Sequence, residues 1–185
     1  MSSFETRRTG GYTPPEFWRF RPFFTLQTVA ATRDKQLKLW KELVLQYCIQ
    51  GNLHSLIPAA FPFFENPSLD RKMNAAGIEA VVNYIIRAGN AEWEDEGHTS
   101  LRIIWKTPLV LAGEVYQWAI RENQLGQVST IYELHSGEEQ QDSGFHGCDP
   151  VILRRALEIL ESSDKCRILK GAQPDEDGVK FLAVK

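Results

Sequence analysis

The chain has 185 residues, of which 43% are hydrophobic, and a formal net charge of −3. This length and composition are typical of a soluble globular protein with one or two small domains. No apolar run approaches the roughly 20 residues of a membrane span, and residues 1–12 lack the apolar centre of a signal peptide, so we expect a cytosolic protein.

An unusual run of prolines and large aromatic residues follows the polar start of the chain. Proline disfavours a helix and no alternation supports a strand, so we predict an extended arm over residues 1–26. Two interpretations stay open. Either the arm folds back over its own domain as a hydrophobic cover, or its rings anchor in another subunit. The run consists of Pro14, Pro15, Phe17, Trp18, Phe20, Pro22, Phe23, Phe24 and Leu26.

Residues 27–106 predict a winged helix, because the expected order is helix, strand, helix, helix, hairpin. The third helix is the clearest, since its apolar residues recur at the spacing of one helical face: Ile78, Val81, Val82, Ile85 and Ile86. The expected elements are a helix from an N-cap at Thr32 to about Ile49, a strand over residues 53–57, a short helix over residues 68–73, the third helix from Asn74, and hairpin strands at residues 91–94 and 100–105.

The same order recurs after Thr107 and Pro108, so the chain reads as a tandem repeat. We expect helices over residues 108–122 and from Asp149, a short strand at residues 127–128, a short helix capped by Ser129 or Thr130, and wing strands at residues 166–169 and 179–184. The predicted fold is therefore α+β, with two tandem winged-helix domains at residues 27–106 and 107–185 behind an extended Pro/aromatic arm at residues 1–26.

Winged helices often bind nucleic acid through the third helix and the wing, which makes nucleic-acid binding or a transcription-associated role the alternative function. The charges argue against it. Residues 1–106 carry 13 Lys and Arg against 11 Asp and Glu, and residues 107–185 carry 8 against 13. The first wing holds Glu92, Glu94, Asp95 and Glu96, which phosphates would repel.

Residues with catalytic or metal-binding potential are scattered along the chain. The three cysteines lie far apart without CxxC spacing, and only His146 comes near one of them, Cys148. Consecutive acids on a hairpin turn are usually a solvated tip rather than an acid–base pair. We therefore expect no enzyme activity, no metal and no cofactor.

Several short segments, by their order and spacing, carry a resemblance that covers most of the chain. They are residues 21–27 (Arg-Pro-Phe-Phe-Thr-Leu-Gln), 116–118, 132–134, 136–138, 145–147 and 178–181. The chain resembles the vacuolar protein sorting-associated protein 25 family, the small subunit of the ESCRT-II endosomal sorting complex. The resemblance implies two winged-helix domains, no catalysis, two larger winged-helix subunits as partners, and a C-terminal domain that recruits the first ESCRT-III subunit through its N-terminal helix. Membrane contact is then indirect, through a complex recruited to endosomes.

The family's arm carries two Pro-Pro-x-aromatic motifs that dock the larger subunits. Here the second becomes residues 21–24, with Arg21 in place of the first proline, and the family's spacing puts the first on residues 15–18, one residue after the literal match at residues 14–17. The implied docking residues are Pro15, Phe17, Trp18, Pro22, Phe23 and Phe24. Alanine at Trp18 or Phe24 should weaken docking by about 2 kcal/mol while leaving folding nearly unaffected.

For the ESCRT-III subunit, the acidic loop suggests a surface that receives a basic helix. The candidate residues are Glu138, Glu139, Asp142 and Phe145. We expect Phe145 at the surface, because it follows a polar loop and precedes Gly147. Ile168 and Phe181 are also candidates, although alternation along their strands favours the core.

Overall fold

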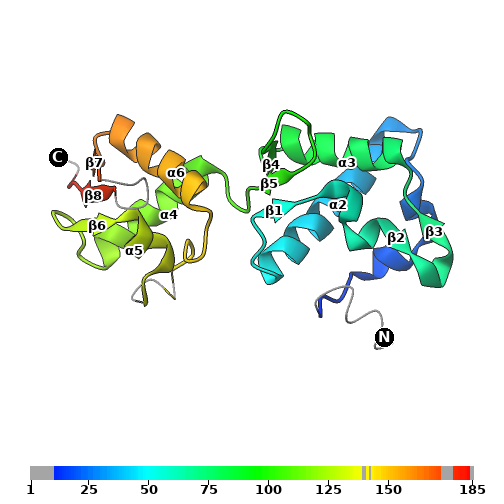
Figure 1. The fold of residues 1–185 in the computed structure, drawn as a ribbon, viewed down its shortest axis with the longest axis horizontal. Coiled ribbons are helices and arrows are strands. Elements are labelled where there is room, and N and C mark those ends of the chain that lie inside the picture. Colours follow the sequence, from blue (N-terminus) through cyan, green and yellow to red (C-terminus); the bar gives the residue numbers. More distant parts are fainter. Residues whose placement is uncertain (1–10, 139–140, 142, 172–176, 184–185) are drawn as a thin grey trace. The chain divides into compact units, whose positions relative to one another are not determined.

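The chain forms two compact units, Met1–Trp105 and Lys106–Lys185 (Figure 1). The structure is a computed structural model that describes residues 11–138, 141, 143–171 and 177–183. Each unit combines helices with a small antiparallel sheet, so the predicted α+β class is confirmed. The division falls one residue before the expected boundary, and the described part of the arm packs within the first unit.

The first unit is built on two long helices. Helix α2 (Ala30–Gln50) buries Trp40, Leu43 and Cys48 along one face, and α3 (Ala75–Arg87) buries Val81, Val82 and Ile85. The Asn74 side chain accepts a hydrogen bond from the N–H of Gly77 and so caps α3, as a helix N-cap should. A Cβ at residue 77 would lie 2.7 Å from Met73 Cγ, so a larger residue in the first turn of α3 would force the Met73 side chain to shift.

Three short strands complete the winged helix of the first unit. They are β1 (Ser55–Leu56), β4 (Ala91–Trp93) and β5 (Leu101–Ile103), in the order β1-β5-β4, and the β4–β5 hairpin is the wing. In this register Arg102 of β5 lies opposite both Ser55 and Glu92. Alternate residues of β5 therefore face the core, where Leu101 and Ile103 are each 1% exposed.

Two expectations for the first unit are wrong at the level of local structure. Helix α2 begins at Ala30, before Thr32, and its N-cap residue Val29 makes no side-chain cap. The short helix expected at residues 68–73 is instead a two-stranded ribbon of β2 (Glu65–Asn66) and β3 (Arg71–Lys72), joined by the 3-10 turn η5 (Pro67–Leu69). Asp70 has a φ of 51°, which reverses the chain and ends any helix there.

The second unit repeats the winged-helix order. It contains α4 (Pro108–Arg121), β6 (Val128–Thr130), α5 (Ile131–Ser136), α6 (Pro150–Ser162), β7 (Cys166–Leu169) and β8 (Gly178–Phe181), with the sheet order β6-β8-β7. Thr130 caps α5 in a reciprocal capping box with Glu133, and Asp149 caps α6. Leu134, Leu153 and Phe181, all fully buried, contribute one residue each from α5, α6 and β8 to the core.

Candidate protein-interaction surfaces

The described part of the arm, residues 11–26, is not extended throughout. It contains two 3-10 turns, η1 (Glu16–Arg19) and η2 (Arg21–Phe24), each stabilised by hydrogen bonds between main-chain groups three residues apart. Pro15 precedes the first turn and Pro22 lies near the start of the second, where the fixed φ of proline suits a helical turn. The prolines therefore shape two consecutive turns rather than a straight segment.

Three predicted docking rings are buried in the core of their own unit. Trp18, Phe23 and Phe24 are 8%, 5% and 3% exposed. The Phe23 ring stacks on the indole of Trp40 from α2, with ring centroids 4.3 Å apart and an angle of 14° between the planes. This burial contradicts the expectation that alanine at Trp18 or Phe24 leaves folding unaffected, because such a change opens a cavity in the core.

Hydrogen bonds also tie the arm to the rest of the unit. The Trp18 indole donates to the carbonyl of Phe63 at 2.8 Å, and the Asn66 side chain donates to the carbonyl of Trp18 at 3.1 Å. Gln36, on α2, donates to the carbonyl of Phe23 at 2.9 Å. These bonds satisfy the polar groups that the arm buries, so the arm is an integral part of the first unit.

The exposed edge of the arm is formed by other residues. Of the predicted set, Pro22 is exposed, while Pro15 and Phe17 are half-buried. Phe20 belongs to the Pro/aromatic run but not to the predicted docking residues, yet it is 62% exposed. Arg19 and Arg21 on either side of it are also exposed, and Arg21 donates to the carbonyl of Leu69 at 3.2 Å. In the sequence, the position of Phe20 between two arginines is the signal that its ring points outward.

Phe145 lies in the core of the second unit, so its expected surface position is wrong. It is 1% exposed and its ring meets that of Trp118 edge to face at 5.3 Å. Glu138 is exposed, whereas Glu139 and Asp142 lie outside the described residues. The expected core positions hold for Phe181, which is fully buried, while Ile168 is half-buried. Among the predicted ESCRT-III contact residues that the structure describes, Glu138 is therefore the exposed one.

A hollow of about 410 Å³ lies between α4 and the loop that carries Phe145. Lys106 fixes this loop beside the helix, because its ammonium contacts Glu114 Oε2 at 2.5 Å and the carbonyl of Gly144 at 2.7 Å. The exposed apolar residues Leu109 and Ile120 of α4 lie outside the hollow. The hollow is lined by Val110, Gly113, Glu114, Gln117, Trp118, Arg121, Ser143, Gly144 and Phe145.

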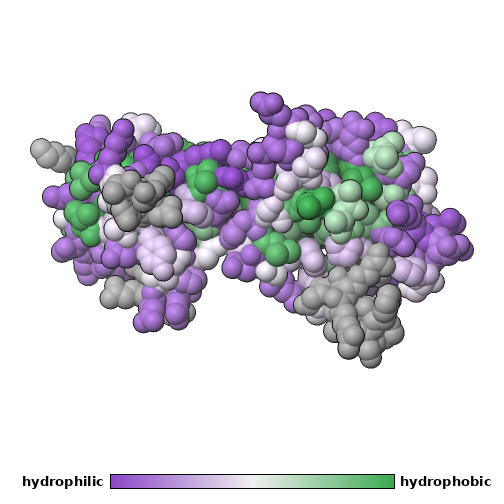
Figure 2. Space-filling view, viewed as in Figure 1, coloured by the Kyte–Doolittle hydropathy of each residue, from purple (hydrophilic) through white to green (hydrophobic). Residues whose placement is uncertain are grey.

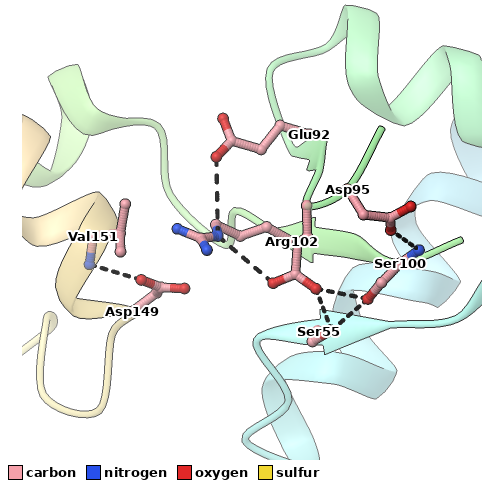
Figure 3. A network of polar contacts seen from close by, with 8 residues as sticks. Ser55, Glu92, Asp95, Ser100, Arg102, Asp149 and Val151 are labelled. Carbon is pink, nitrogen blue, oxygen red and sulfur yellow. Dashed lines mark hydrogen bonds and ion pairs between the residues drawn. The ribbon is translucent and has the colours of Figure 1, made fainter. Parts of the chain in front are cut away.

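The acidic first wing is organised by hydrogen bonds (Figure 3). Hydroxyl groups of Ser100 and Ser55 donate to Glu94 and hold the pKa of its carboxyl below the usual value. The main-chain N–H of Ser100, drawn in Figure 3, and that of Thr99 likewise lower the pKa of the Asp95 carboxyl. Arg102 lies 3.7 Å from a Glu94 oxygen. These carboxylates stay ionised at neutral pH, which disfavours phosphate binding at this wing.

The described residues contain no cluster of three or more His, Cys, Asp or Glu side chains placed to hold a metal ion. Burial raises the pKa of the thiols of Cys48 and Cys148 to about 12, so neither forms a reactive thiolate at neutral pH. None of the helices in the described ranges combines the length and apolar character needed to cross a membrane.

Comparison with known proteins identifies the family. The model of the ESCRT-II complex subunit family matches residues 17–149. A vacuolar protein sorting-associated protein 25 from Arabidopsis thaliana is 39% identical over 169 residues, which cover 90% of this chain and 94% of the relative. The Homo sapiens protein of the same name is 39% identical over 171 residues, covering 91% and 96%. The chain belongs to the vacuolar protein sorting-associated protein 25 family.

Solved structures of this family share the fold. The crystal structure of subunit VPS25 of the endosomal trafficking complex ESCRT-II superposes with a TM-score of 0.76 at 23% identity, covering 91% of this chain and 98% of that one. A chain in the crystal structure of endosomal complex ESCRT-II (VPS22/VPS25/VPS36) gives a TM-score of 0.72 at 23% identity, covering 90% of this chain and 98% of that one. The tandem winged-helix fold of this vacuolar protein sorting-associated protein 25 family member is therefore that of the solved VPS25 structures.

Proposed function

We propose that the chain is a non-enzymatic adaptor subunit of ESCRT-II, in the sorting of ubiquitinated membrane cargo to multivesicular bodies. Its relatives are ESCRT-II subunits, and VPS25 has been solved in a complex with VPS22 and VPS36. In this proposal the arm docks the two larger subunits, and the second unit recruits the first ESCRT-III subunit. The protein works in the cytoplasm and reaches endosomal membranes only through the assembled complex.

The observation that carries the docking part is the exposed edge of the arm. Phe20, 62% exposed, stands between Arg19 and Arg21, and the exposed Pro22 follows them. An exposed aromatic ring beside arginines is the composition of an interface hot spot. Because Trp18, Phe23 and Phe24 are needed inside the unit, we assign the direct contacts to Phe20, Pro22 and the half-buried Pro15 and Phe17.

Calorimetry against a purified VPS22/VPS36 complex tests this assignment. Phe20→Ala should weaken binding by about 2 kcal/mol, a factor of roughly 30, because a hot-spot ring is lost. The control is Val29→Ala, which removes a 64% exposed apolar side chain just after the arm and should leave affinity unchanged. Circular dichroism of both variants should match the wild type, since both side chains are exposed. Unchanged affinity in Phe20→Ala contradicts the assignment.

For the ESCRT-III subunit we assign the hollow beside α4 as the docking surface of a helix. Val110 is 51% exposed and Gly113 adds a gap in the helix surface, so an apolar side chain has room to enter. Trp118 and Phe145 form the buried floor, which gives Phe145 an indirect role. The exposed Glu138 and the surplus of acidic over basic residues in the second unit favour the approach of a basic helix.

The probe for this surface is the N-terminal helix of the ESCRT-III subunit, titrated against the full chain. Gly113→Arg should weaken binding at least about tenfold, because its side chain fills the hollow. A Cβ at residue 113 meets nothing within 4 Å, so folding should be retained. Val128→Arg, at a 55% exposed apolar position on β6, is the control. Equal affinities of the two variants place the helix elsewhere.

A further inference from the structure

A second apolar groove crosses the first unit, apart from both surfaces assigned above. It consists of a hollow of about 730 Å³ between α3, the turn η3 (Pro58–Ala60) and the wing, and one of about 360 Å³ beside η4 (Pro62–Phe64). Ala59 and Ile78 line both hollows, so the two adjoin. In Figure 2 hydrophobic residues gather on the first unit in the region where Figure 1 draws α2 and α3.

The floor and walls of the larger hollow are apolar. Residues at helical spacing on α3, namely Ala75, Ile78 and Val82, form the floor. Ile57, which is 55% exposed, and Trp93 of the wing line the same hollow. An exposed apolar surface of this extent on a folded domain is typical of a binding site.

The wall formed by the wing is fixed before any ligand arrives. The rings of Trp93 and His98 stack with centroids 4.7 Å apart and planes 15° apart. The Asp95 side chain accepts hydrogen bonds from the main chain of Thr99 and Ser100, which holds the loop that carries His98. A preformed wall reduces the ordering cost of binding, so the groove is suited to recognition.

One charge at the groove is uncompensated. Glu79 lines the larger hollow, is exposed, and has no ion-pair partner in the described part of the chain. At the far end, Lys72 and Glu65 lie 3.8 Å apart and offset each other. Charge complementarity therefore favours an occupant with a cation beside its apolar side chains.

We propose that this groove binds a short amphipathic helix of a partner protein. Two bulky aliphatic or aromatic side chains enter the two hollows, and a Lys or Arg of the partner lies beside Glu79. A helical occupant fits because the floor of the larger hollow is the surface of α3, and the ridges of a second helix can pack into the grooves of such a surface. Phe20 and Pro22 are not among the lining residues, so the site is independent of the docking assigned to the arm.

Calorimetry with the full chain and two synthetic peptides tests the proposal. Both peptides carry a leucine stripe at helical spacing, flanked by lysine in one and by glutamate in the other. The lysine peptide should bind, and Ala59→Arg should weaken it at least about tenfold, because Ala59 is shared by both hollows and is exposed. Glu79→Lys should weaken the lysine peptide roughly fivefold and strengthen the glutamate peptide.

The control variant is Ala76→Arg, which places the same side chain on the exposed surface of α3 outside the groove. It should bind the lysine peptide as the wild type does. The proposal is overturned if the wild type fails to bind this peptide at millimolar concentration, if Ala59→Arg and Ala76→Arg behave alike, or if reversing Glu79 changes neither peptide's affinity. None of these outcomes bears on the arm, whose affinity for the larger subunits is measured separately.

Discussion

Single side chains of the arm divide between the buried core and the exposed surface. Trp18 is 8% exposed and donates a hydrogen bond to Phe63, whereas Phe20, two residues later, is 62% exposed. Trp18 lies within the 3-10 helix η1 and Phe20 lies between η1 and η2, so the two rings point in different directions. Residues of similar chemistry in one short run therefore lie in different surroundings, and substitution should affect stability at one and not at the other.

Trp18→Ala should lower the free energy of unfolding of the first unit by about 3–5 kcal/mol, the usual cost of removing a large buried ring. Phe20→Ala should change it by less than about 0.5 kcal/mol, because its ring is mostly in water. Chemical denaturation measures the free energy of unfolding of both variants. It is followed by tryptophan fluorescence and also by circular dichroism, because Trp18→Ala removes one of the fluorophores. Similar stabilities for the two variants would show that the arm is not part of the core in solution.

Asp177 gives the second unit an acid-sensitive contact. It accepts a hydrogen bond from the N–H of Gly171 at 2.8 Å and pairs with Arg154, and these contacts hold the pKa of its carboxyl below the ordinary value. Because the folded-state pKa is lower than the unfolded one, the stabilisation is complete above the unfolded pKa of about 3.9 and is lost as the pH falls through the folded pKa.

Asp177→Asn should therefore destabilise the second unit at pH 7 and flatten its loss of stability in acid. Asp164→Asn is the matched control, since Asp164 pairs with Arg167 at an 80% exposed side chain and asparagine tolerates its φ of 55°. Urea denaturation at a series of pH values from neutral to about 3 compares the two variants with the wild type. If Asp177→Asn loses stability in acid as steeply as the wild type does, the Asp177 carboxylate is not the cause of that loss.

At the scale of elements, side-chain caps set the starts of α3, α4, α5 and α6, whereas α2 begins without one. Thr130 accepts a hydrogen bond from the N–H of Glu133 at 3.1 Å, and the Glu133 side chain accepts one from the N–H of Thr130 at 2.7 Å. The sequence left Ser129 and Thr130 as alternative caps, since both hydroxyls suit the position. The structure selects Thr130, because only this choice places glutamate three residues later.

Thr130→Ala should lower the free energy of unfolding of the second unit by about 1 kcal/mol, because it removes the cap of α5. Ser129→Ala should be close to neutral, as Ser129 lies within β6 and its side chain does not cap the helix. Thermal unfolding monitored by circular dichroism compares the two. A larger effect of Ser129→Ala would reverse the assignment of the cap.

Elements with strong local signals were predictable, and elements decided by long-range packing were not. The periodic apolar residues of α3 and the Asp149–Pro150 start of α6 both appear as expected. Residues 68–73 were wrongly given to a helix because the pairing of Glu65 with Lys72 is not visible in sequence. Phe145 was wrongly placed at the surface because its polar flanks hide its contact with Trp118. Packing of the arm on its own domain could not be predicted either, because it depends on the contact of Phe23 with Trp40, which is distant in the sequence.

At the scale of the whole molecule, the arm belongs to the first unit in its folding. Residues 11–105 should therefore unfold cooperatively when expressed alone, whereas residues 27–105 should lack a cooperative transition, because the shorter fragment loses Trp18, Phe23 and Phe24 from the core. Denaturation of the two fragments, followed by circular dichroism, is the measurement. A stable, cooperative fragment 27–105 would show that the arm is dispensable for folding.

The burial of the arm rings bears on how cellular quality control meets a folded copy of the chain that stands alone. Quality control in the cell recognises exposed apolar surface, and such an orphan subunit keeps Trp18, Phe23 and Phe24 inside its own fold. It can then wait in solution without being captured by chaperones or proteases through these rings. A copy whose first unit has failed to fold exposes the arm and the core together. Exposure of these rings therefore marks a copy whose first unit is unfolded, and not a folded copy that stands alone.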